Sequence, residues 1–483
     1  MSDSLLVIDV GTSGLRAAIV RPDGSVEHNT YRPFVPDSPF PGLVEFDASL
    51  MASTVLEVAN IALAAGGPVG GVGITNQRAS TIIWDAATGE PIGPSLGWQD
   101  LRTVGECMTA ASEHGLKLAP NQSVTKVASM LNAFDPARSR DLRFGTVDTW
   151  LIWKLSGGAL HVTDRSNAAV TGMSTADATR WDGDVLSIFD IPDRMLPSLV
   201  DSIGIIGPAT ELPGAPLIAG IAGDQQASLI GQCCVRPGQA KATFGTGGML
   251  DINTGERPRA IKGRSAGGTF PIVAWTQHGQ FTWGSEAIML SAGTNVEWLR
   301  DDLGIIPDAA SSHAIASQCE TTDGVVYVPA LLGLGTPRWD YGARAAFFGV
   351  TRGTARPQIV RAVLEGVAHR GADLLEAVET DAGMTVEALR VDGGMSANPT
   401  FVQALANATG RRIEVSPIPD ATTVGAGYLA GLAIGTWGGL DELAENWHPS
   451  SVVEPTAQLD RDRWARAIEQ SSGWIPELSA LDF

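Results

Sequence analysis

The sequence predicts an α/β protein built from two similar domains, and three observations support this prediction. The chain has 483 residues, a length for which about two to four domains are usual. Strand-like and helix-like segments are mixed along the chain, as in layered α/β folds. A strand, a Gly-Thr turn and a second strand occur twice, at Gly11-Thr12 and at Gly245-Thr246, which suggests an internal duplication.

The first predicted domain opens with an antiparallel meander rather than a βαβ unit. Its short apolar or alternating runs are separated by glycine-containing turns, and a periodic apolar segment comes after them. We expect strands over 5–10, 15–21 and 25–32, turns at 11–14 and 23–24, a proline-rich loop at 33–41 and a helix over 48–64.

The second predicted domain repeats the hairpin and then alternates helices with strands. We expect strands over 240–244, 249–253, 389–391 and 411–415, and helices over 285–303, 358–377 and 399–408. Glycine-rich hairpins are common, so the repeat alone does not establish a duplication. We place the domain boundary after the helix-like segment that follows Asp224, which gives domains 1–234 and 235–483.

Charge and cysteine content exclude several functions. The net charge is −20 and there is no basic run, so neither nucleic acid nor an anionic membrane is an expected partner. The four cysteines form no CxxC motif, which argues against a zinc or thioredoxin-type site. We expect four buried free thiols in a reducing compartment.

No segment predicts export or membrane insertion. The N-terminus lacks the basic and long apolar regions of a signal peptide. Residues 421–440 carry no charge, but they include six glycines, which favours a close-packed helix of a soluble protein over a membrane span. We therefore expect a cytoplasmic protein.

The glycine turns predict a phosphate-binding site that is not a P-loop. GxxxxGK[ST] does not occur, and Gly11 precedes a strand, unlike the first glycine of a dinucleotide fingerprint. Backbone N–H groups in such turns form nests for anions, so two facing hairpins with threonine hydroxyls could hold a triphosphate. Asp9, at the end of the first strand, is placed to position Mg²⁺ through water.

Asp224 has two interpretations that local sequence does not separate. It lies where an apolar run ending in glycine meets a helix-like segment, so it is a candidate N-cap. It is equally a candidate general base that takes a proton from a hydroxyl during attack on phosphorus. A carboxylate at a helix N-terminus tends to stay ionised, as a base must.

Eight segments of the chain carry a resemblance to a known family; in chain order they are DVGTSGLRAAIV, GITNQRAST, GWQDLRT, FGTVDTWLIWKL, GDQQASLIGQ, FGTGGMLDINTG, WDYGARAAFFGVTRG and LRVDGGMSANPTF. Together they resemble the FGGY family of carbohydrate kinases, and within it the glycerol kinases most. The resemblance covers residues 6–437, and it implies two actin- and hexokinase-type (ribonuclease H-like) domains with a nucleotide cleft between them. It also implies ATP, Mg²⁺ and a polyol or sugar acceptor.

The resemblance assigns roles to individual residues. Asp224 matches the catalytic base, Gln225 an amide that contacts the acceptor, and Asp9 the aspartate near the metal. Arg78 and Trp98 match residues that line the acceptor pocket. The nucleotide-binding positions match Thr12, Ser13, Gly14 and Arg16 in the first phosphate loop, Gly245 and Thr246 in the second, and Gly293, Gly394 and Asn398 beyond it.

Three acceptor contacts depart from the glycerol kinase pattern. A glutamate after the arginine is replaced by Ala79, a pocket tyrosine by Asn121 and a pocket phenylalanine by Met249. A site that loses a buried hydrogen-bonding carboxylate discriminates differently among ligands. We therefore expect an altered pocket that takes glycerol, a longer sugar alcohol or a ketopentose such as xylulose.

An actin-like protein that binds ATP without kinase activity is the alternative. Asp224 and the pair Arg78 and Trp98 favour the kinase, because a protein without an acceptor has no physical need for a base beside an acceptor pocket. The sequence does not decide between a monomer and a homo-oligomer.

Overall fold

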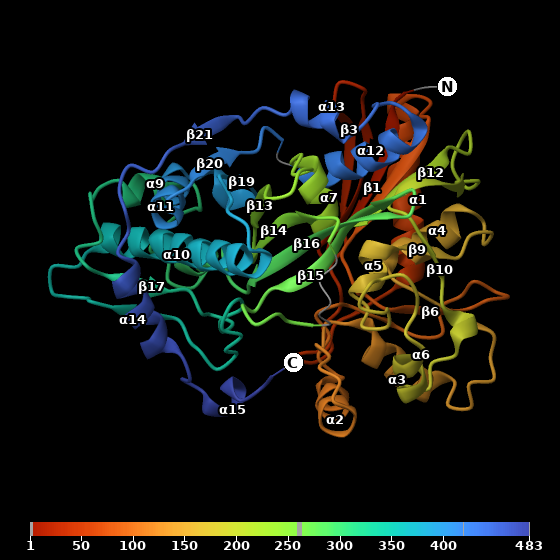
Figure 1. Ribbon diagram of the computed structural model, residues 1–483, viewed down its shortest axis with the longest axis horizontal. Coiled ribbons are helices and arrows are strands. Elements are labelled where there is room, and N and C mark those ends of the chain that lie inside the picture. The colour runs from red at the N-terminus through yellow and green to blue at the C-terminus, as the bar shows by residue number, and fades with distance from the viewer. Residues whose placement is uncertain (1–2, 258–262, 419, 483) are drawn as a thin grey trace.

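The computed structural model describes residues 3–257, 263–418 and 420–482 (Figure 1). One mixed sheet runs through the described molecule and carries most of its core. Its thirteen described strands are, in spatial order, β21 (Ser451–Val453), β20 (Arg412–Val415), β19 (Ala388–Asp392), β13 (Ala240–Phe244), β14 (Gly248–Gly255), β16 (Gln280–Met289), β15 (Phe270–Gln277), β11 (Ile203–Pro208), β12 (Leu217–Gly223), β5 (Gly71–Asn76), β1 (Leu5–Val10), β2 (Gly14–Val20) and β3 (Val26–Pro33).

The order of strand pairing occurs twice, as the repeated hairpin predicts. In the first half, up to residue 234, β1 pairs antiparallel with β2 and parallel with β5, and β5 pairs parallel with β12. In the second half, from residue 235, β13 pairs antiparallel with β14 and parallel with β19, and β19 pairs parallel with β20. The two-domain α/β prediction is thus confirmed, and the antiparallel meander β1–β2–β3 is present.

Helices cover both faces of the sheet, and α9, α10 and α11 gather over the second half at the left of Figure 1. The first-half helices are α1 (Ala48–Gly66), α2 (Val104–His114), α3 (Ser123–Phe134), α4 (Val147–Leu155), α5 (Arg165–Ala169), α6 (Gly183–Ile188) and α7 (Asp224–Gly231). The second-half helices are α8 (Thr294–Asp301), α9 (Ser311–Ala316), α10 (Arg356–Ala382), α11 (Pro399–Thr409), α12 (Ala421–Ile434), α13 (Leu440–Asn446), α14 (Arg461–Ser471) and α15 (Pro476–Ser479).

Among the described residues, four two-stranded ribbons lie outside the main sheet. Two of them, with α2, α3 and α6, belong to the part of the first half that packs around Ile83, Leu96 and Phe144. The pairs are β4 (Glu45–Phe46) with β7 (Ser95–Leu96), β6 (Ile82–Asp85) with β8 (Leu142–Gly145), β9 (Val162–Asp164) with β10 (Ser198–Val200), and β17 (Val326–Val328) with β18 (Ala346–Phe348).

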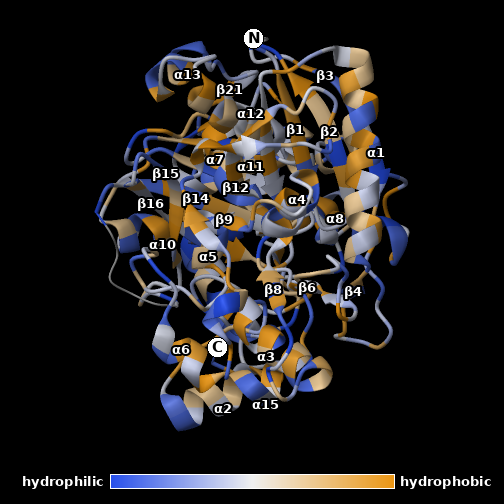
Figure 2. Ribbon diagram, turned by 90° about the vertical axis from the view of Figure 1, so that its right-hand side faces the viewer, coloured by the Kyte–Doolittle hydropathy of each residue, from blue (hydrophilic) through white to orange (hydrophobic). Residues whose placement is uncertain are grey.

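Helix α1 is long and apolar enough to cross a membrane by length and composition, but it is a core helix here. Met51, Val55 and Val58 are buried in the cluster that packs on the first-half sheet. Figure 2 shows α1 standing beside β1 and β2 at one edge of the molecule. The helix predicted over 48–64 is therefore confirmed.

Helix α12 packs against α7 and against the first-half sheet, although it belongs to the second half in sequence. Its small residues permit this contact. A Cβ on Gly425 would lie far inside van der Waals contact with the carbonyl oxygen of Ala227, and a Cβ on Gly231 would meet that of Ala421 in the same way. The close-packed helix expected over 421–440 is present, and it ends at Ile434.

The helix predicted over 285–303 is wrong in its first part. Residues 285–289 form the end of β16, which hydrogen-bonds to β14 on one side and β15 on the other. The helical segment α8 begins only at Thr294, after a Ser-Ala-Gly turn. Pairing on both sides overrides local helical spacing, because a central strand gains a full set of backbone hydrogen bonds. Glu286 therefore lies on the sheet, in β16.

The expectation of four buried thiols holds for three of them. Cys107, Cys233 and Cys234 are buried, whereas Cys319 is partly exposed after α9. All four are free, and burial raises the pKa of the Cys233 and Cys234 thiols to about 12. These two thiols are therefore protonated and poorly reactive at neutral pH.

We predict that Gly425→Ala lowers the free energy of unfolding by about 1–3 kcal/mol, because the new methyl group overpacks the contact between α12 and α7. Gly105 in α2 is the matched control, since a Cβ there meets no atom within 4 Å. Gly105→Ala should raise the free energy of unfolding by about 0.4–1 kcal/mol. Chemical denaturation of both variants measures the difference, and equal effects would contradict the packing.

Candidate active site

Asp224 lies at the point where β12 ends and α7 begins. Gly223 is the N-cap residue, and Asp224 is the first residue of the helix, so the N-cap interpretation of its carboxylate is wrong. Its Oδ1 accepts a 2.8 Å hydrogen bond from the N–H of Gln225, and the side chain keeps 30% of its exposure. The carboxylate is thus held at the positive end of the helix while remaining accessible.

Arg78 connects Asp224 to the other half of the molecule. Its Nε lies 3.4 Å from Oδ1 of Asp224, and its Nη2 donates a 2.7 Å hydrogen bond to Oε2 of Glu286 on β16. Gly223 makes room for this arrangement, because a Cβ there would lie 2.6 Å from Cδ of Arg78. The ion pair between Arg78 and Glu286 therefore joins the two halves beside the candidate base.

Burial and the charge of Arg78 have opposite effects on the pKa values of Asp224 and Glu286. Burial raises the pKa of Asp224, and the charge of Arg78 opposes the rise. Burial likewise raises the pKa of Glu286, again against Arg78. A base whose pKa is raised toward the working pH accepts a proton more readily once a hydroxyl attacks.

One donor of Arg78 has no partner. Its Nη1 is buried, and it makes no hydrogen bond to the described residues. A buried guanidinium N–H that lacks an acceptor costs free energy, so the group is suited to a ligand oxygen.

The other first-half residues that the resemblance assigns to the acceptor pocket lie around the start of α3. The Oγ of Ser123 donates to the carbonyl oxygen of Ala79 at 3.0 Å. The Nζ of Lys126 donates to the carbonyl oxygens of Trp98 at 3.1 Å and Asn121 at 3.2 Å. Burial lowers the pKa of Lys126 to about 7. The segments that carry Ala79, Trp98 and Asn121 are therefore neighbours.

The three departures from the glycerol kinase pattern have distinct surroundings. Ala79 is buried and adopts a left-handed backbone conformation with φ of 61°. Asn121 is exposed, and it contacts Lys126 through its backbone carbonyl. Met249 is half-buried on β14, two residues before Asp251, so both side chains point to the same face of the sheet.

The first phosphate loop lies beside the acceptor segments. Thr12 Oγ1 accepts a 3.1 Å hydrogen bond from the indole N–H of Trp98, and Arg16 forms an ion pair with Asp420. Ser13 is exposed. Gly14 lacks space for a side chain, because the ring of Tyr31 covers it.

The second phosphate loop contacts the segment of Gly293. The N–H of Gly293 donates to the carbonyl oxygen of Gly245 at 2.8 Å, and a Cβ on Gly293 would lie 2.6 Å from that oxygen. Thr246 and Gly394 are exposed, as a contact with a nucleotide requires. Asn398 caps α11, and its Nδ2 donates to the Oγ of Ser312 at 2.8 Å.

The hairpin glycines do not adopt the left-handed backbone conformations that glycine favours. Neither Gly11 nor Gly14 nor Gly245 has a positive φ, so the turns do not depend on left-handed backbone conformations. Gly14 is required for space, whereas Gly245 faces open volume, since a Cβ there would come no closer than 4.0 Å to the carbonyl oxygen of Gly247. The glycines keep the backbone accessible to an anion.

Asp9 on β1 has the chemistry for a cation. Its Oδ2 accepts a 3.1 Å hydrogen bond from Thr423, and burial raises its pKa to about 6 against the opposing charge of Arg16. Among the described ranges, no cluster of three or more acidic, histidine or cysteine side chains forms a metal site. One carboxylate suits Mg²⁺, which usually keeps several waters and binds substrate phosphates.

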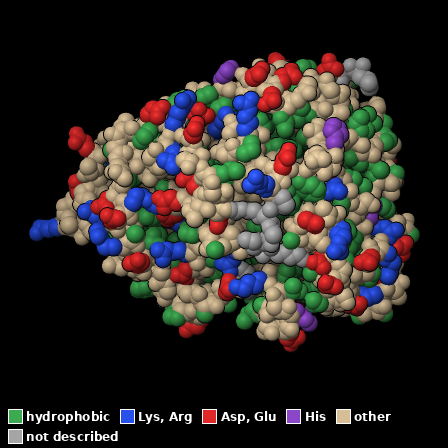
Figure 3. Space-filling model, in the orientation of Figure 1, with side chains coloured by type: hydrophobic (Ala, Val, Ile, Leu, Met, Phe, Trp, Pro, Cys, Tyr) green, Lys and Arg blue, Asp and Glu red, His purple; other side chains and the backbone are tan. Residues whose placement is uncertain are grey.

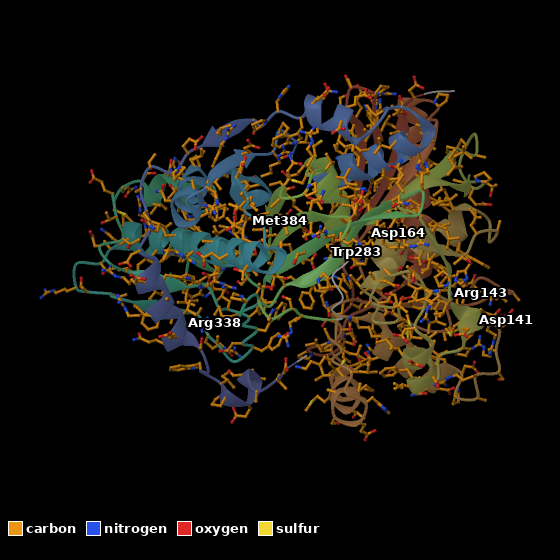
Figure 4. The ribbon with its side chains drawn as sticks, in the orientation of Figure 1. Asp141, Arg143, Asp164, Trp283, Arg338 and Met384 are labelled. Carbon is orange, nitrogen blue, oxygen red and sulfur yellow. The ribbon has the colours of Figure 1, made fainter. Side chains whose placement is uncertain are left out.

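Sequence reasoning missed three charged residues on neighbouring strands. Glu286 was hidden by the wrong helix assignment. Lys241 on β13 and Asp251 on β14 are fully buried and form an ion pair of 2.8 Å. Charged residues inside apolar strands were the available signal, because such groups are rarely buried without a partner. Trp283 lies on the same strand as Glu286, three residues before it, and its label in Figure 4 shows that this strand runs through the middle of the molecule.

The fold and this arrangement define a class of protein: a two-domain α/β kinase of small carbohydrates. The chain belongs to the FGGY family of carbohydrate kinases. Residues 4–231 match the N-terminal domain of that family and residues 240–434 its C-terminal domain. Members of this family are ATP-dependent phosphotransferases, and this chain is a kinase of that type.

Named relatives match over nearly the whole chain. It is 40% identical to a glycerol kinase of Aromatoleum aromaticum, over 98% of this chain and 99% of that protein. A structure of Plasmodium falciparum glycerol kinase with ADP has a TM-score of 0.90 at 28% identity, covering 97% of this chain and 98% of the other. A ligand-bound xylulose kinase of Lactobacillus acidophilus, with a TM-score of 0.84 at 20% identity and 99% coverage of both chains, shares the fold.

We predict that Asp224→Asn keeps ATP binding and lowers kcat about 10²–10⁴-fold, because an amide cannot accept the hydroxyl proton. Asp184→Asn is the control, since Asp184 also lies in the first turn of a helix, α6, but is exposed. It should leave kcat unchanged. Steady-state kinetics with the best acceptor measure both, and near wild-type kcat for Asp224→Asn would rule out its role as the base.

Proposed function

We propose that this kinase phosphorylates a hydroxyl of a small polyol or sugar at the site formed by Asp224 and Arg78. The observation that carries the proposal is the unpartnered Nη1 of Arg78, buried within an arginine that also contacts the carboxylate of Asp224. Arg78 can donate a hydrogen bond that orients a hydroxyl, and Asp224 beside it can accept the proton of that hydroxyl.

The residues would act as follows. Arg78 donates to an acceptor oxygen and keeps Asp224 ionised until the hydroxyl attacks, when Asp224 takes its proton. The two Gly-Thr loops hold the phosphate chain of ATP through backbone N–H groups, with Arg16 beside them. Asp9 would hold Mg²⁺ through water, and the ion would neutralise charge on the phosphates.

We propose that the acceptor is longer than glycerol. The named relatives are glycerol kinases, which supports a polyol as the acceptor. The other two candidate acceptors are glycerol itself and a ketopentose such as xylulose. The side chain of Ala79 is a buried methyl group where glycerol kinases carry a carboxylate, and Asn121 is smaller than the tyrosine it replaces. These smaller side chains would leave room for further carbon atoms.

The alternative, an actin-like protein that binds ATP without phosphorylating an acceptor, is disfavoured. Membership of a kinase family and the base beside a free arginine donor both argue for catalysis.

A cytoplasmic location and a small-molecule partner fit the free thiols and the family. On the face in Figure 3, Lys and Arg side chains are interspersed with Asp and Glu. The oligomeric state stays open between a monomer and a homo-oligomer. The division into 1–234 and 235–483 stays a prediction, and α12 shows that packing crosses it.

We predict that Gly245→Val raises the KM for ATP while the protein stays folded. The position has open space within the protein, so the side chain would obstruct only the approaching phosphate chain. Gly204→Val on β11 is the control, because a Cβ there also meets no atom within 4 Å. An unchanged KM for ATP in folded Gly245→Val would remove this loop from the nucleotide site.

We predict that kcat/KM of the wild type is higher for some acceptor of four or more carbons than for glycerol. Ala79→Glu should shift preference toward glycerol, by about tenfold to a hundredfold at most, because a charge-assisted hydrogen bond is worth about 1.5–3 kcal/mol. Ala79→Gln controls for size without charge and should shift preference less. A screen of glycerol, tetritols, pentitols and ketopentoses measures both.

If the wild type prefers glycerol over every longer acceptor, the missing glutamate does not report specificity. The phosphorylation chemistry would stand, and only the proposed acceptor length would fall.

A further inference from the structure

Three neighbouring strands of the second half place charged side chains in one cross-strand row. Lys241 of β13 is in register with Asp251 of β14, and Asp251 is in register with Glu286 of β16. Residues opposite one another on adjacent strands share a face of the sheet. Lys241 and Asp251 are fully buried, and Glu286 is 5% exposed, so the row is an internal feature of the fold.

Each end of the row contacts a residue predicted to bind the acceptor. At one end, Glu286 accepts the 2.7 Å hydrogen bond from Arg78. At the other, the Nζ of Lys241 donates to Oε1 of Gln225 at 2.6 Å. The same Nζ lies 2.8 Å from Oδ2 of Asp251 and 3.2 Å from the hydroxyl of Thr243. The row therefore contacts both Arg78 and Gln225, the two residues predicted to bind the acceptor.

The chemistry of lysine fixes the orientation of the Gln225 amide. An ammonium group has three donors and no acceptor, so the carbonyl oxygen of the amide must face it. The NH₂ group of Gln225 then points away from Lys241 and is left as a donor. The contact therefore determines which of two chemically opposite groups the amide presents.

Charge balance explains why Asp251 is needed. A lysine buried without a counter-charge destabilises the fold. Asp251 lies opposite Lys241, 2.8 Å from its Nζ, and supplies that counter-charge. The carboxylates of Asp224, Glu286 and Asp392 also lie within the electrostatic reach of Lys241.

We propose that Lys241 and Asp251 are positioning residues that orient Gln225 so that its NH₂ group donates to an oxygen of the acceptor. This inference rests on the proposed function, in which Gln225 contacts the acceptor. The acceptor then receives two hydrogen bonds, from Gln225 and from Arg78, and gives its proton to Asp224. The site is thus suited to an oxygen-rich acceptor without a cationic group.

The test replaces the ion pair as a unit, because removing one buried charge alone is strongly destabilising. Lys241→Met/Asp251→Leu should remain folded in thermal unfolding. It should raise the KM for the acceptor about tenfold and leave the KM for ATP within about twofold, since only the amide loses its orientation. Lys241→Arg keeps donors at this position and should retain most of the acceptor affinity.

Two further variants separate orientation from simple structural support. In a Gln225→Ala background, the same double replacement should cause no additional change in the acceptor KM. Gln225→Glu, which removes the donor but can still contact Lys241, should raise the acceptor KM by a similar factor, and it tests the proposal if the double variant does not fold. The control is Arg411→Met/Glu379→Leu, a partly buried ion pair at the opposite end of α11 from Asn398, which should change neither KM.

An unchanged acceptor KM in a folded Lys241→Met/Asp251→Leu variant would overturn the proposal, and so would an equal rise in both KM values. An unchanged acceptor KM in Gln225→Glu would also overturn it. Failure of the proposed function looks different, as the wild type would then phosphorylate no polyol or sugar. In that case the contact can be tested through stability alone. If Lys241→Met and Gln225→Ala change the free energy of unfolding additively when combined, the two side chains do not interact, and the proposal is overturned.

Discussion

The ion pair between Arg78 and Glu286 is the interaction on which the site depends. It joins a loop after β5 to the central strand β16, residues that are 208 positions apart in the sequence. It holds Nε of the guanidinium 3.4 Å from Oδ1 of Asp224, and the buried Nη1 makes no hydrogen bond to the described residues. Glu286 is the nearer of the two carboxylates to Arg78, at 2.7 Å against 3.4 Å for Asp224, so Glu286 competes with the proposed base for the guanidinium.

The sheet supplies the geometry that makes this pair possible. The pairing order of β1, β2, β5 and β12 recurs in β13, β14, β19 and β20, so each half contributes one hairpin loop. In the first loop Gly14 occupies a position where a side chain would meet the ring of Tyr31, whereas Gly245 in the second loop faces open space. Helix α12 reaches from the second half onto the first-half sheet, so both halves share one packed layer.

Much of the fold could be predicted from the sequence, because the hairpins and the helix over 48–64 have clear local patterns. The helix over 285–303 could not, since the apolar spacing of a short segment does not show whether a strand will pair on both sides. That error hid Glu286, and with it the partner of Arg78. The role of Asp224 as a base stays a prediction from its surroundings in sequence, whereas its competing N-cap role could be excluded only by backbone geometry.

The row of Lys241, Asp251 and Glu286 shows what lies beyond such reasoning. The three residues are 45 positions apart at most, yet nothing in their spacing reveals that register places them side by side. Cross-strand register is set by turns and by burial of one face, which are properties of the whole sheet. Residues that act through a neighbour are therefore harder to find than residues that carry a motif.

A crystal structure with the preferred acceptor and a non-hydrolysable ATP analogue tests the central claim most directly. We expect one acceptor hydroxyl within about 3.2 Å of a carboxylate oxygen of Asp224, with an acceptor oxygen bonded to Nη1 of Arg78. The γ-phosphate should lie between the two Gly-Thr loops and face that hydroxyl. An acceptor bound elsewhere, with Asp224 contacting only Arg78, would contradict the account.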